Sequence, residues 1–506
     1  MRRSSELYII VLLVWAVLVA AALTTFRQDI SKAWAINWYA GIGVVASVVF
    51  MIYFWLNGTK TLAYTLFYYA RLKRDKRASI QTRPPTSSYD PKAAPLVALV
   101  YCTRNDFNAD SLEASMRQVY PNFETVILDD STDKNYIVSI DVFAKAHGVK
   151  VVRRRDRIGF KAGNLNNYLK DATYDYFVLL DSDEIIPKDF IARSLDYFSR
   201  DTSVGIVQGS HIAAHMRNQF TRTFAWSIES QNIMFQSIKQ EYGFMALEGH
   251  GAMVSKACYD AAGGFPHVVS EDICFSINAR NNGFTIVFAP DIVCKEEYPV
   301  DYFALKQRQS KWIQGNVEFI QQYTKQMIRA KIRWYEKLDV LLHTYNLPVH
   351  TFFSIFVPIN AILLPAVHYH LKYPVWMLGP TVIFFITPML NDIIYYYRKL
   401  SIVKLAWYLT HTSLLYGSMF FISLWSVFKA IFGVPNFPVT PKSARNPSVL
   451  GIFGANIPEL LLAVGLLWIA GAIDKNPFLV ALVALPSILS IYFSTLAKRE
   501  YAEIEV

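Results

Sequence analysis

The stretch Tyr176-Phe177-Val178-Leu179-Leu180-Asp181-Ser182-Asp183 places two carboxylates directly after a short apolar run. A run of this length and composition predicts a buried β-strand. Three similar runs precede it, at residues 96–101, 123–128 and 149–152, and helical patterns lie between them. Strands that alternate with helices predict an α/β, doubly wound sheet, in which ligands bind beyond the carboxyl ends of the strands.

Acidic side chains follow two of these predicted strands. Asp129 and Asp130 come after the run at 123–128, and Asp181 and Asp183 come after the run at 176–180. Mg²⁺ and Mn²⁺ are commonly held by one or two carboxylates together with substrate phosphates, so either pair suits a metal-bound diphosphate. Aspartates that cap helices in solvated turns give the same pattern. Two such pairs at strand ends of one unit favour a ligand site.

Two further segments have residues suited to chemistry. Lys161 and Gly163 lie at a predicted loop-to-helix junction, where backbone N–H groups and a cation can meet a phosphate. A helix is predicted to begin at residue 270, and Glu271 and Asp272 lie in its first turn. Acidic residues are also favourable at helix starts without any catalytic role, so this pair has a structural explanation as well.

The flanks of this polar region are apolar. The 506 residues are 53% hydrophobic and 18% charged, with a formal net charge of +10, which excludes a disordered chain. Since about 20 apolar residues cross a bilayer as a helix, we expect six spans, and these are at residues 7–26, 38–56, 342–367, 373–396, 450–473 and 478–497. The expected domains are an N-terminal hairpin with a basic linker (1–83), a polar domain that ends in interfacial helices (84–338), and a C-terminal membrane domain (339–506).

Basic residues set the expected orientation. Arg2 and Arg3, the segment 71–83 and the pair at 498–499 flank the spans, so the positive-inside rule places both termini and the polar domain in the cytosol. A crossing at 405–433 would put residues 498–499 outside. We therefore expect 405–433 to lie along the interface or re-enter, followed by a loop at 434–448; an ordinary seventh span is the alternative.

Five motifs occur in the order of a known family: Asp129-Asp130, the run 161–166, Asp181-Ser182-Asp183, Ser270-Glu271-Asp272, and Arg308-Gln309-Ser310-Lys311-Trp312. Together they resemble the family 2 membrane glycosyltransferases, which include cellulose, chitin and hyaluronan synthases. The run Phe437-Pro438-Val439-Thr440-Pro441-Lys442 is similar to the gating loop of cellulose synthases and related β-glucan synthases. The resemblance implies a GT-A-type nucleotide-sugar domain inserted in a helical membrane domain of about six spans with interfacial helices.

The resemblance also implies a role for each matching residue. Asp272 matches the general base, Trp312 and Glu271 match acceptor-binding positions, and Asp181 and Asp183 would hold Mg²⁺ or Mn²⁺. The residues expected to bind the donor are Asp106, Asp129, Asp130, Lys161, Asp181, Arg308, Lys311, Thr440 and Lys442. Arg308 and Lys311 stand where the family usually has Gln and Arg, and Asp106 stands where Glu is common, so the phosphate contacts should be arranged differently.

The leading hypothesis is a processive inverting glycosyltransferase that polymerises a UDP-sugar, most readily UDP-glucose, into a cellulose-like β-glucan and translocates it. Its expected partners are the UDP-sugar, the growing polysaccharide and the bilayer of the plasma membrane, with room for accessory export subunits. Nucleic acid is not needed to explain the positive charge. One alternative is an enzyme that adds one or a few sugars to a membrane lipid, and the other is a non-catalytic transporter derived from the fold.

Overall fold

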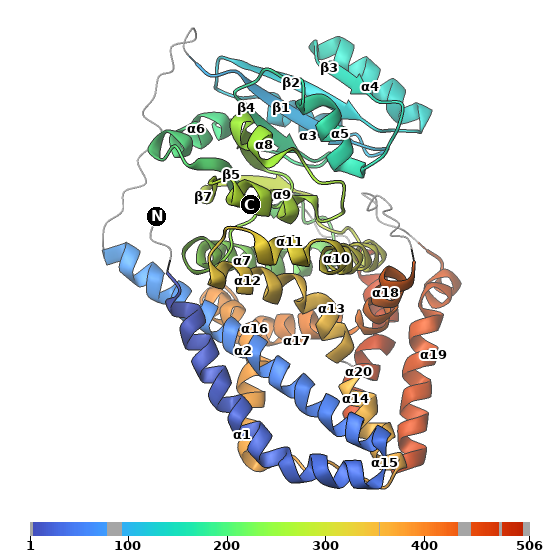
Figure 1. Ribbon diagram of the computed structural model, residues 1–506. Helices are drawn as coiled ribbons and strands as arrows, with labels where there is room; N and C mark the ends of the chain where they lie inside the picture. Colours follow the sequence, from blue (N-terminus) through green and yellow to red (C-terminus); the bar gives the residue numbers. More distant parts are fainter. Residues whose placement is uncertain (1–3, 78–93, 354, 434–446, 475–477, 499–506) are drawn as a thin grey trace.

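The computed structural model describes residues 4–77, 94–353, 355–433, 447–474 and 478–498, which form three layers (Figure 1). A sheet domain lies at the top of the view, a set of helices crosses the middle, and long helices extend below. The layers follow the chain's pattern of polar and apolar segments. The middle helices join the end of the sheet domain to the long helices.

A seven-stranded mixed sheet forms the centre of the upper domain, with strand order β3-β2-β1-β4-β6-β5-β7. The first four strands confirm the four predicted runs; they are β1 Val97–Thr103, β2 Phe123–Asp129, β3 Lys150–Arg153 and β4 Tyr176–Leu180. The remaining strands are β5 Val204–Ala213, β6 Ala252–Ser255 and β7 Thr285–Glu296. β6 runs antiparallel to both β4 and β5, so the doubly wound half is extended by a mixed half, as in a GT-A-type fold.

Both faces of the sheet are covered by helices. Alternate residues of β1 illustrate this, because Leu99 packs in one hydrophobic cluster and Val100 in the other. Strands buried on both faces read as continuous apolar runs, which explains why β1 and β4 could be recognised from sequence. The covering helices are α3 Ala109–Met116, α4 Lys134–His147, α5 Phe160–Leu169, α6 Phe190–Arg200, α8 Lys256–Ala262 and α9 Glu271–Asn281.

The middle layer consists of α7 Gln219–Tyr242, α10 Tyr302–Gln322, α11 Thr324–Arg329 and α12 Trp334–Thr344 (Figure 1). One buried carboxylate joins this layer to the long helices and to the sheet domain. Asp339 of α12 accepts hydrogen bonds from the hydroxyls of Tyr8 and Tyr64 and from the backbone N–H of Phe244. The first helix of the chain is therefore bonded to a residue more than three hundred positions later.

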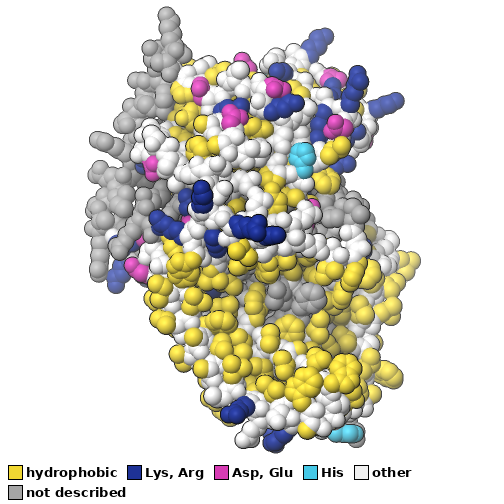
Figure 2. All heavy atoms as spheres, in the orientation of Figure 1, with side chains coloured by type: hydrophobic (Ala, Val, Ile, Leu, Met, Phe, Trp, Pro, Cys, Tyr) yellow, Lys and Arg dark blue, Asp and Glu magenta, His cyan; other side chains and the backbone are white. Residues whose placement is uncertain are grey.

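Six helices in the described part of the chain are long and apolar enough to cross a membrane. They are Glu6–Ile36, Trp38–Arg74, Val375–Tyr396, Ile402–Phe432, Val449–Ile473 and Phe478–Lys498. The visible face in Figure 2 is hydrophobic over these helices and charged over the sheet domain, with Lys and Arg side chains at the boundary. The composition and this surface identify a membrane protein with a polar domain on one side.

The segment Ile402–Phe432 contains a break. α17 Ile402–Gly417 and α18 Phe420–Phe432 are separate helices, and each is shorter than the roughly 20 residues that a crossing needs. α18 packs on α10, where Val427 joins the cluster of Ile313 and the Ser426 hydroxyl donates to Ser310 Oγ at 2.8 Å. α18 thus contacts the middle layer, and the interfacial placement of residues 405–433 stays a prediction.

We expected residues 342–367 to cross the membrane as one continuous helix, and this prediction is wrong. The described chain there divides into α13 Asn346–Phe353, α14 Phe356–Pro358, a π-helical turn Ile359–Leu363 and α15 Leu364–Ala366. Pro358 and Pro365 lack the N–H that helical hydrogen bonds require, which favours such interruptions. An apolar composition alone could not indicate these breaks.

Candidate active site at the carboxyl edge of the sheet

The two aspartates after β2 are held by two consecutive arginines. Asp129 accepts from Arg153 Nε at 2.6 Å, and Asp130 makes a bidentate pair with Arg154, at 2.9 Å to Nε and 2.6 Å to Nη2. Both carboxylates are buried, so each needs a partner of opposite charge. The sequence signal that could have found these partners is the run of three arginines at 153–155, at the end of β3, although it does not show which arginine pairs with which aspartate.

Asp106 connects two loops at the same edge. Its Oδ1 accepts from Thr103 Oγ1 at 2.9 Å and from the Arg104 N–H at 2.7 Å, while its Oδ2 accepts from Ser182 Oγ at 2.7 Å. Asp106 thus ties the end of β1 to the turn that contains Asp181 and Asp183. These contacts give Asp106 a positioning role in addition to the donor contact predicted for it.

Lys161 reaches the Asp181 carboxylate from the first turn of α5. Its Nζ donates to Asp181 Oδ1 and to the carbonyl oxygen of Gly249 at 2.9 Å. Burial acts to lower the pKa of Lys161, but the adjacent Asp181 outweighs it and the pKa is raised. Gly163 allows α5 to lie close to the preceding loop, since a Cβ there would lie 2.0 Å from the Ile158 carbonyl oxygen. The predicted loop-to-helix junction is confirmed, with Lys161 one residue inside the helix.

Asp181 and Asp183 follow β4 on one turn, as predicted. Asp183 is buried, whereas the Asp181 side chain is 39% exposed and accepts from Lys161. Two carboxylates on one short turn suit a hard divalent cation that also binds substrate phosphates. The donor set present here therefore fits Mg²⁺ or Mn²⁺.

The acidic pair at the start of α9 lies beside this turn. A Cβ on Gly249, whose carbonyl accepts from Lys161, would be 3.8 Å from Asp272 Oδ2. Burial and the neighbouring Asp272 raise the pKa of Glu271 to about 7, although Lys161 and Lys311 act in the opposite direction. Burial also raises the pKa of Asp272, partly offset by the hydrogen bond that its carboxylate accepts from a backbone N–H.

α10 brings the last motif to the acidic pair. A Cβ on Gly315 would lie 3.0 Å from Ser270 Oγ, so the glycine lets α10 approach the start of α9. The Arg308 guanidinium lies 4.2 Å from the Trp312 ring centroid, a cation–π contact. Trp312 is 47% exposed, which leaves part of the indole available to another flat surface.

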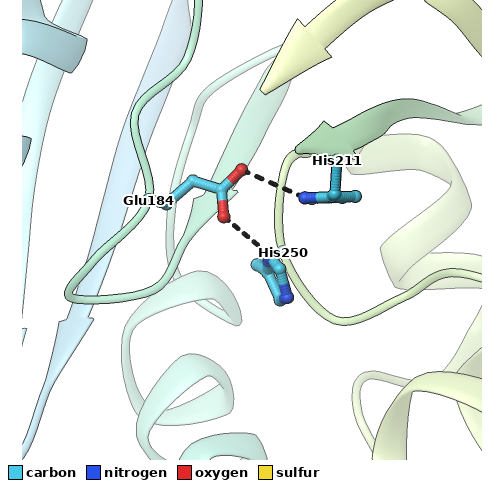
Figure 3. Close-up of side chains that lie close together, drawn as sticks. All are labelled: Glu184, His211 and His250. Atoms are coloured by element: carbon cyan, nitrogen blue, oxygen red, sulfur yellow. Dashed lines mark hydrogen bonds and ion pairs between the residues drawn. The ribbon is translucent and has the colours of Figure 1, made fainter. Parts of the chain in front are cut away.

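A buried cluster behind this edge was missed by sequence reasoning. Glu184 follows the Asp181–Asp183 turn, His211 belongs to β5, and His250 lies in the loop before β6 (Figure 3). Burial raises the pKa of Glu184 to about 7, partly offset by His250. Burial acts to lower the pKa of His250, but Glu184 and Glu296 raise it to about 10. No spacing rule joins three residues from three separate segments.

The structure thus gathers most of the predicted site residues at one edge. Lys161, Asp181 and Gly249 are in direct contact, with the Glu271–Asp272 pair and α10 beside them. Asp129, Asp130 and Asp106 lie at the ends of the neighbouring strands β2 and β1. Thr440 and Lys442 of the predicted gating loop lie outside the described residues.

Comparisons with known proteins find relatives of the sheet domain. Residues 94–315 match the family model described as glycosyltransferase like family 2. Glucomannan 4-beta-mannosyltransferase 2 of Arabidopsis thaliana is 24% identical over 304 residues. That alignment covers 56% of this chain and 56% of the relative, so the chain spans about half the length of the curated relative it matches.

Two solved structures illustrate the range of structural similarity. The mannosyltransferase PcManGT from Pyrobaculum calidifontis, in complex with GDP-Man and Mn²⁺, aligns with a TM-score of 0.43 and 18% identity, covering 76% of this chain and 99% of its own. TarS of S. aureus aligns with a TM-score of 0.35 and 14% identity, covering 59% of this chain and 55% of its own.

Proposed function

We propose that this chain, in which residues 94–315 form a family 2 glycosyltransferase domain, is a processive inverting enzyme that polymerises glucose from UDP-glucose into a β-linked polysaccharide. In this proposal its membrane helices translocate the product. The observation that carries the proposal is the arrangement of Lys161, Asp181 and the Glu271–Asp272 pair at one edge of the sheet. A cation, a metal-type carboxylate pair and a base candidate are the groups that glycosyl transfer with inversion requires.

The donor diphosphate would bind at the Asp181–Asp183 turn. Mg²⁺ or Mn²⁺ bound there with the phosphates would supply charge neutralisation for the departing nucleoside diphosphate. Lys161 contacts Asp181 and holds that carboxylate in place, while its positive charge favours the anionic donor. Asp129 and Asp130 would line the nucleoside portion of the site, with Arg153 and Arg154 fixing their carboxylates.

Asp272 is the proposed general base. It would take the proton of the acceptor hydroxyl while that oxygen attacks the anomeric carbon from the face opposite the departing diphosphate, which inverts the configuration. Its raised pKa suits proton transfer near neutral pH better than that of an ordinary aspartate. Glu271 lies next to it and would bind the acceptor sugar.

Trp312 is the proposed platform for the acceptor. An exposed indole can stack on the apolar face of a pyranose, and Arg308 holds the ring by its cation–π contact. Lys311 lies within electrostatic reach of Glu271 and would face the diphosphate. A chain end held in this way after each transfer is what a processive enzyme needs.

The sugar itself has two candidates. The resemblance to β-glucan synthases favours glucose, supplied as UDP-glucose, whereas the name of the Arabidopsis relative favours mannose. We further propose a plasma-membrane location with the sheet domain and both termini in the cytosol. The basic residues that flank the apolar helices support this orientation.

The proposal is tested with purified full-length protein in liposomes, supplied with UDP-glucose, GDP-mannose or both, in the presence of Mg²⁺ or Mn²⁺. Linkage-specific glycosidases and size analysis then identify the product. We expect a long β-linked polymer from UDP-glucose, absent with Asp272→Asn. A polymer formed only with GDP-mannose would show that the donor is GDP-mannose and not UDP-glucose. Short, solvent-extractable glycolipids would replace the polymerase by a lipid glycosyltransferase, and no transfer from either donor would contradict the proposed enzyme.

A further inference from the structure

The buried cluster of Glu184, His211 and His250 comprises two imidazoles and one carboxylate that the proposed transfer reaction does not use (Figure 3). The Glu184 side chain is fully buried and that of His211 is 3% exposed. Each residue comes from a different segment: the end of the Asp181–Asp183 turn, β5, and the loop before β6. Polar groups placed this deep need partners that account for every hydrogen-bonding atom.

Both histidines point the same ring atom at the same carboxylate. His250 Nδ1 lies 2.6 Å from Glu184 Oε2, and His211 Nδ1 lies 3.6 Å from Glu184 Oε1. Potential ligand atoms of the three residues all lie within 4.8 Å of one another. Around tetrahedral zinc, with bonds of about 2.0–2.2 Å, ligand atoms are roughly 3.3 Å apart. Small side-chain movements would therefore bring these ligand atoms to the spacing that zinc requires.

Two atoms of the cluster, Glu184 Oε1 and His211 Nδ1, make no hydrogen bond with the described residues, and neither does the neighbouring Glu248 Oε2. Glu248 N–H donates to Gln208 Oε1 at 2.8 Å, and this fixes the Gln208 amide so that its Nε2 donates to His211 Nε2 at 3.1 Å. Without a metal, the proton of a neutral His211 is then on Nδ1, too far from Glu184 for a hydrogen bond. A cation at Nδ1 would replace that proton and pair Glu184 as well.

Further carboxylates lie behind the two rings. His250 Nε2 is 3.5 Å from Glu296 Oε2, and His211 Nε2 is 3.7 Å from Glu248 Oε2. Metal-binding histidines usually donate their second ring N–H to a carboxylate or carbonyl, and Glu296 and Glu248 lie just beyond hydrogen-bond distance of these two nitrogens. If His211 bound metal through Nδ1, its proton would lie on Nε2, and the Gln208 amide would have to shift away from that nitrogen.

The net charge of the cluster and its neighbours also favours a bound cation. Three carboxylates, from Glu184, Glu248 and Glu296, surround two imidazoles. A protonated His250 between Glu184 and Glu296 is the metal-free solution, but it leaves the Glu184 and His211 atoms that face each other unpaired. A divalent cation compensates the excess negative charge and satisfies both atoms. Two imidazoles and one carboxylate are a common zinc donor set.

We propose that Glu184, His211 and His250 bind one zinc ion, separate from the Mg²⁺ or Mn²⁺ expected with the donor at Asp181 and Asp183. The ion ties the end of the donor turn to β5 and to the loop before β6. Its role is to hold these three segments together, so it should exchange slowly and persist when Mg²⁺ and Mn²⁺ are removed. This inference does not depend on which sugar the enzyme transfers.

The test measures metal content of the purified full-length protein by mass spectrometry, after addition of zinc and dialysis to remove weakly bound ions. We expect one zinc per chain in the native protein and in Asp183→Asn. His211→Gln and His250→Gln should lose it. His215→Gln is the matched control, because His215 also pairs with a carboxylate, that of Glu297, yet lies outside the cluster.

A second measurement does not require the variants to fold. X-ray absorption of the native protein should show zinc with two imidazole ligands and otherwise oxygen ligands at about 2.0–2.2 Å. Less than a tenth of an equivalent of zinc in the native protein would overturn the proposal. Loss of the zinc in Asp183→Asn, with retention in both cluster variants, would also overturn it by assigning the ion to the donor turn.

Discussion

The two halves of the sheet differ in whether their carboxylates contact a basic side chain. In the donor half, β3-β2-β1-β4, a basic side chain contacts each of three aspartates at the strand ends: Arg153 with Asp129, Arg154 with Asp130, and Lys161 with Asp181. In the acceptor half, β6-β5-β7 with α9 and α10, burial raises the pKa of carboxylates that have no such direct contact with an arginine or lysine, as at Glu248 and Glu271.

This difference suggests that the two halves have different chemical roles. Carboxylates held by arginine or lysine are fixed in position, which suits the binding of a nucleotide and a metal ion. Carboxylates with raised pKa values can accept a proton near neutral pH, which suits acid–base chemistry. The following predictions test whether the two halves differ in this way.

The largest effect is expected at the base. Asp272→Asn removes the proton acceptor and keeps nearly the same shape, so kcat should fall by about 10²- to 10⁴-fold. Donor turnover is measured as nucleoside diphosphate release in the presence of acceptor. Glu271→Gln, one residue away, should lower kcat much less. Equal losses in the two variants would show that Asp272 has no distinct role.

In the donor half, Lys161→Met removes the cation that contacts Asp181. Turnover should fall by about 10²-fold, because this positive charge near the diphosphate contributes to electrostatic stabilisation. Raising the Mg²⁺ or Mn²⁺ concentration should restore part of the rate. Lys170→Met is the matched control, since Lys170 lies on the exposed end of the same helix. A Lys161 variant with unchanged turnover would remove this residue from the site.

The pH dependence of kcat distinguishes the halves directly. Glu271 and Asp272 face Lys161, His250 and Lys311, and burial raises the pKa of both carboxylates, that of Glu271 to about 7. A base works when deprotonated, so the rate should fall as pH drops through the raised pKa of Asp272, approaching tenfold for each further unit. A rate that stays flat down to pH 4 would contradict a base with a raised pKa.

The smallest effect is expected at the acceptor platform. Trp312→Ala removes a stacking surface worth about 0.5–1.5 kcal/mol, so the KM for acceptor should rise by up to about tenfold and product chains should shorten. Trp312→Phe should retain most of the function because an aromatic face remains. Initial rates across acceptor concentrations and product size analysis measure this. A change in donor KM alone would place Trp312 on the donor side.

Sequence alone was sufficient for the donor half and less so for the acceptor half. β1 and β4 are buried over most of their length and therefore read as continuous apolar runs, and Asp181 comes directly after β4. β6 is only four residues long and antiparallel, so nothing in its composition sets it apart. The Glu184–His211–His250 cluster and the Arg154–Asp130 pair depend on contacts between segments, which no local pattern specifies.

The Asp339 bridge has a consequence for how the protein is made. The hydroxyl of Tyr8 reaches its carboxylate partner 331 positions later in the chain. At about 5–20 residues per second of synthesis, the ribosome takes roughly 15 to 65 s to supply it. During that interval the first two helices are already in the membrane while the catalytic domain is still emerging. The Tyr8–Asp339 bond is therefore formed late in assembly, and chains that stop before Asp339 should lack it and be more open to the quality-control proteases of the cell.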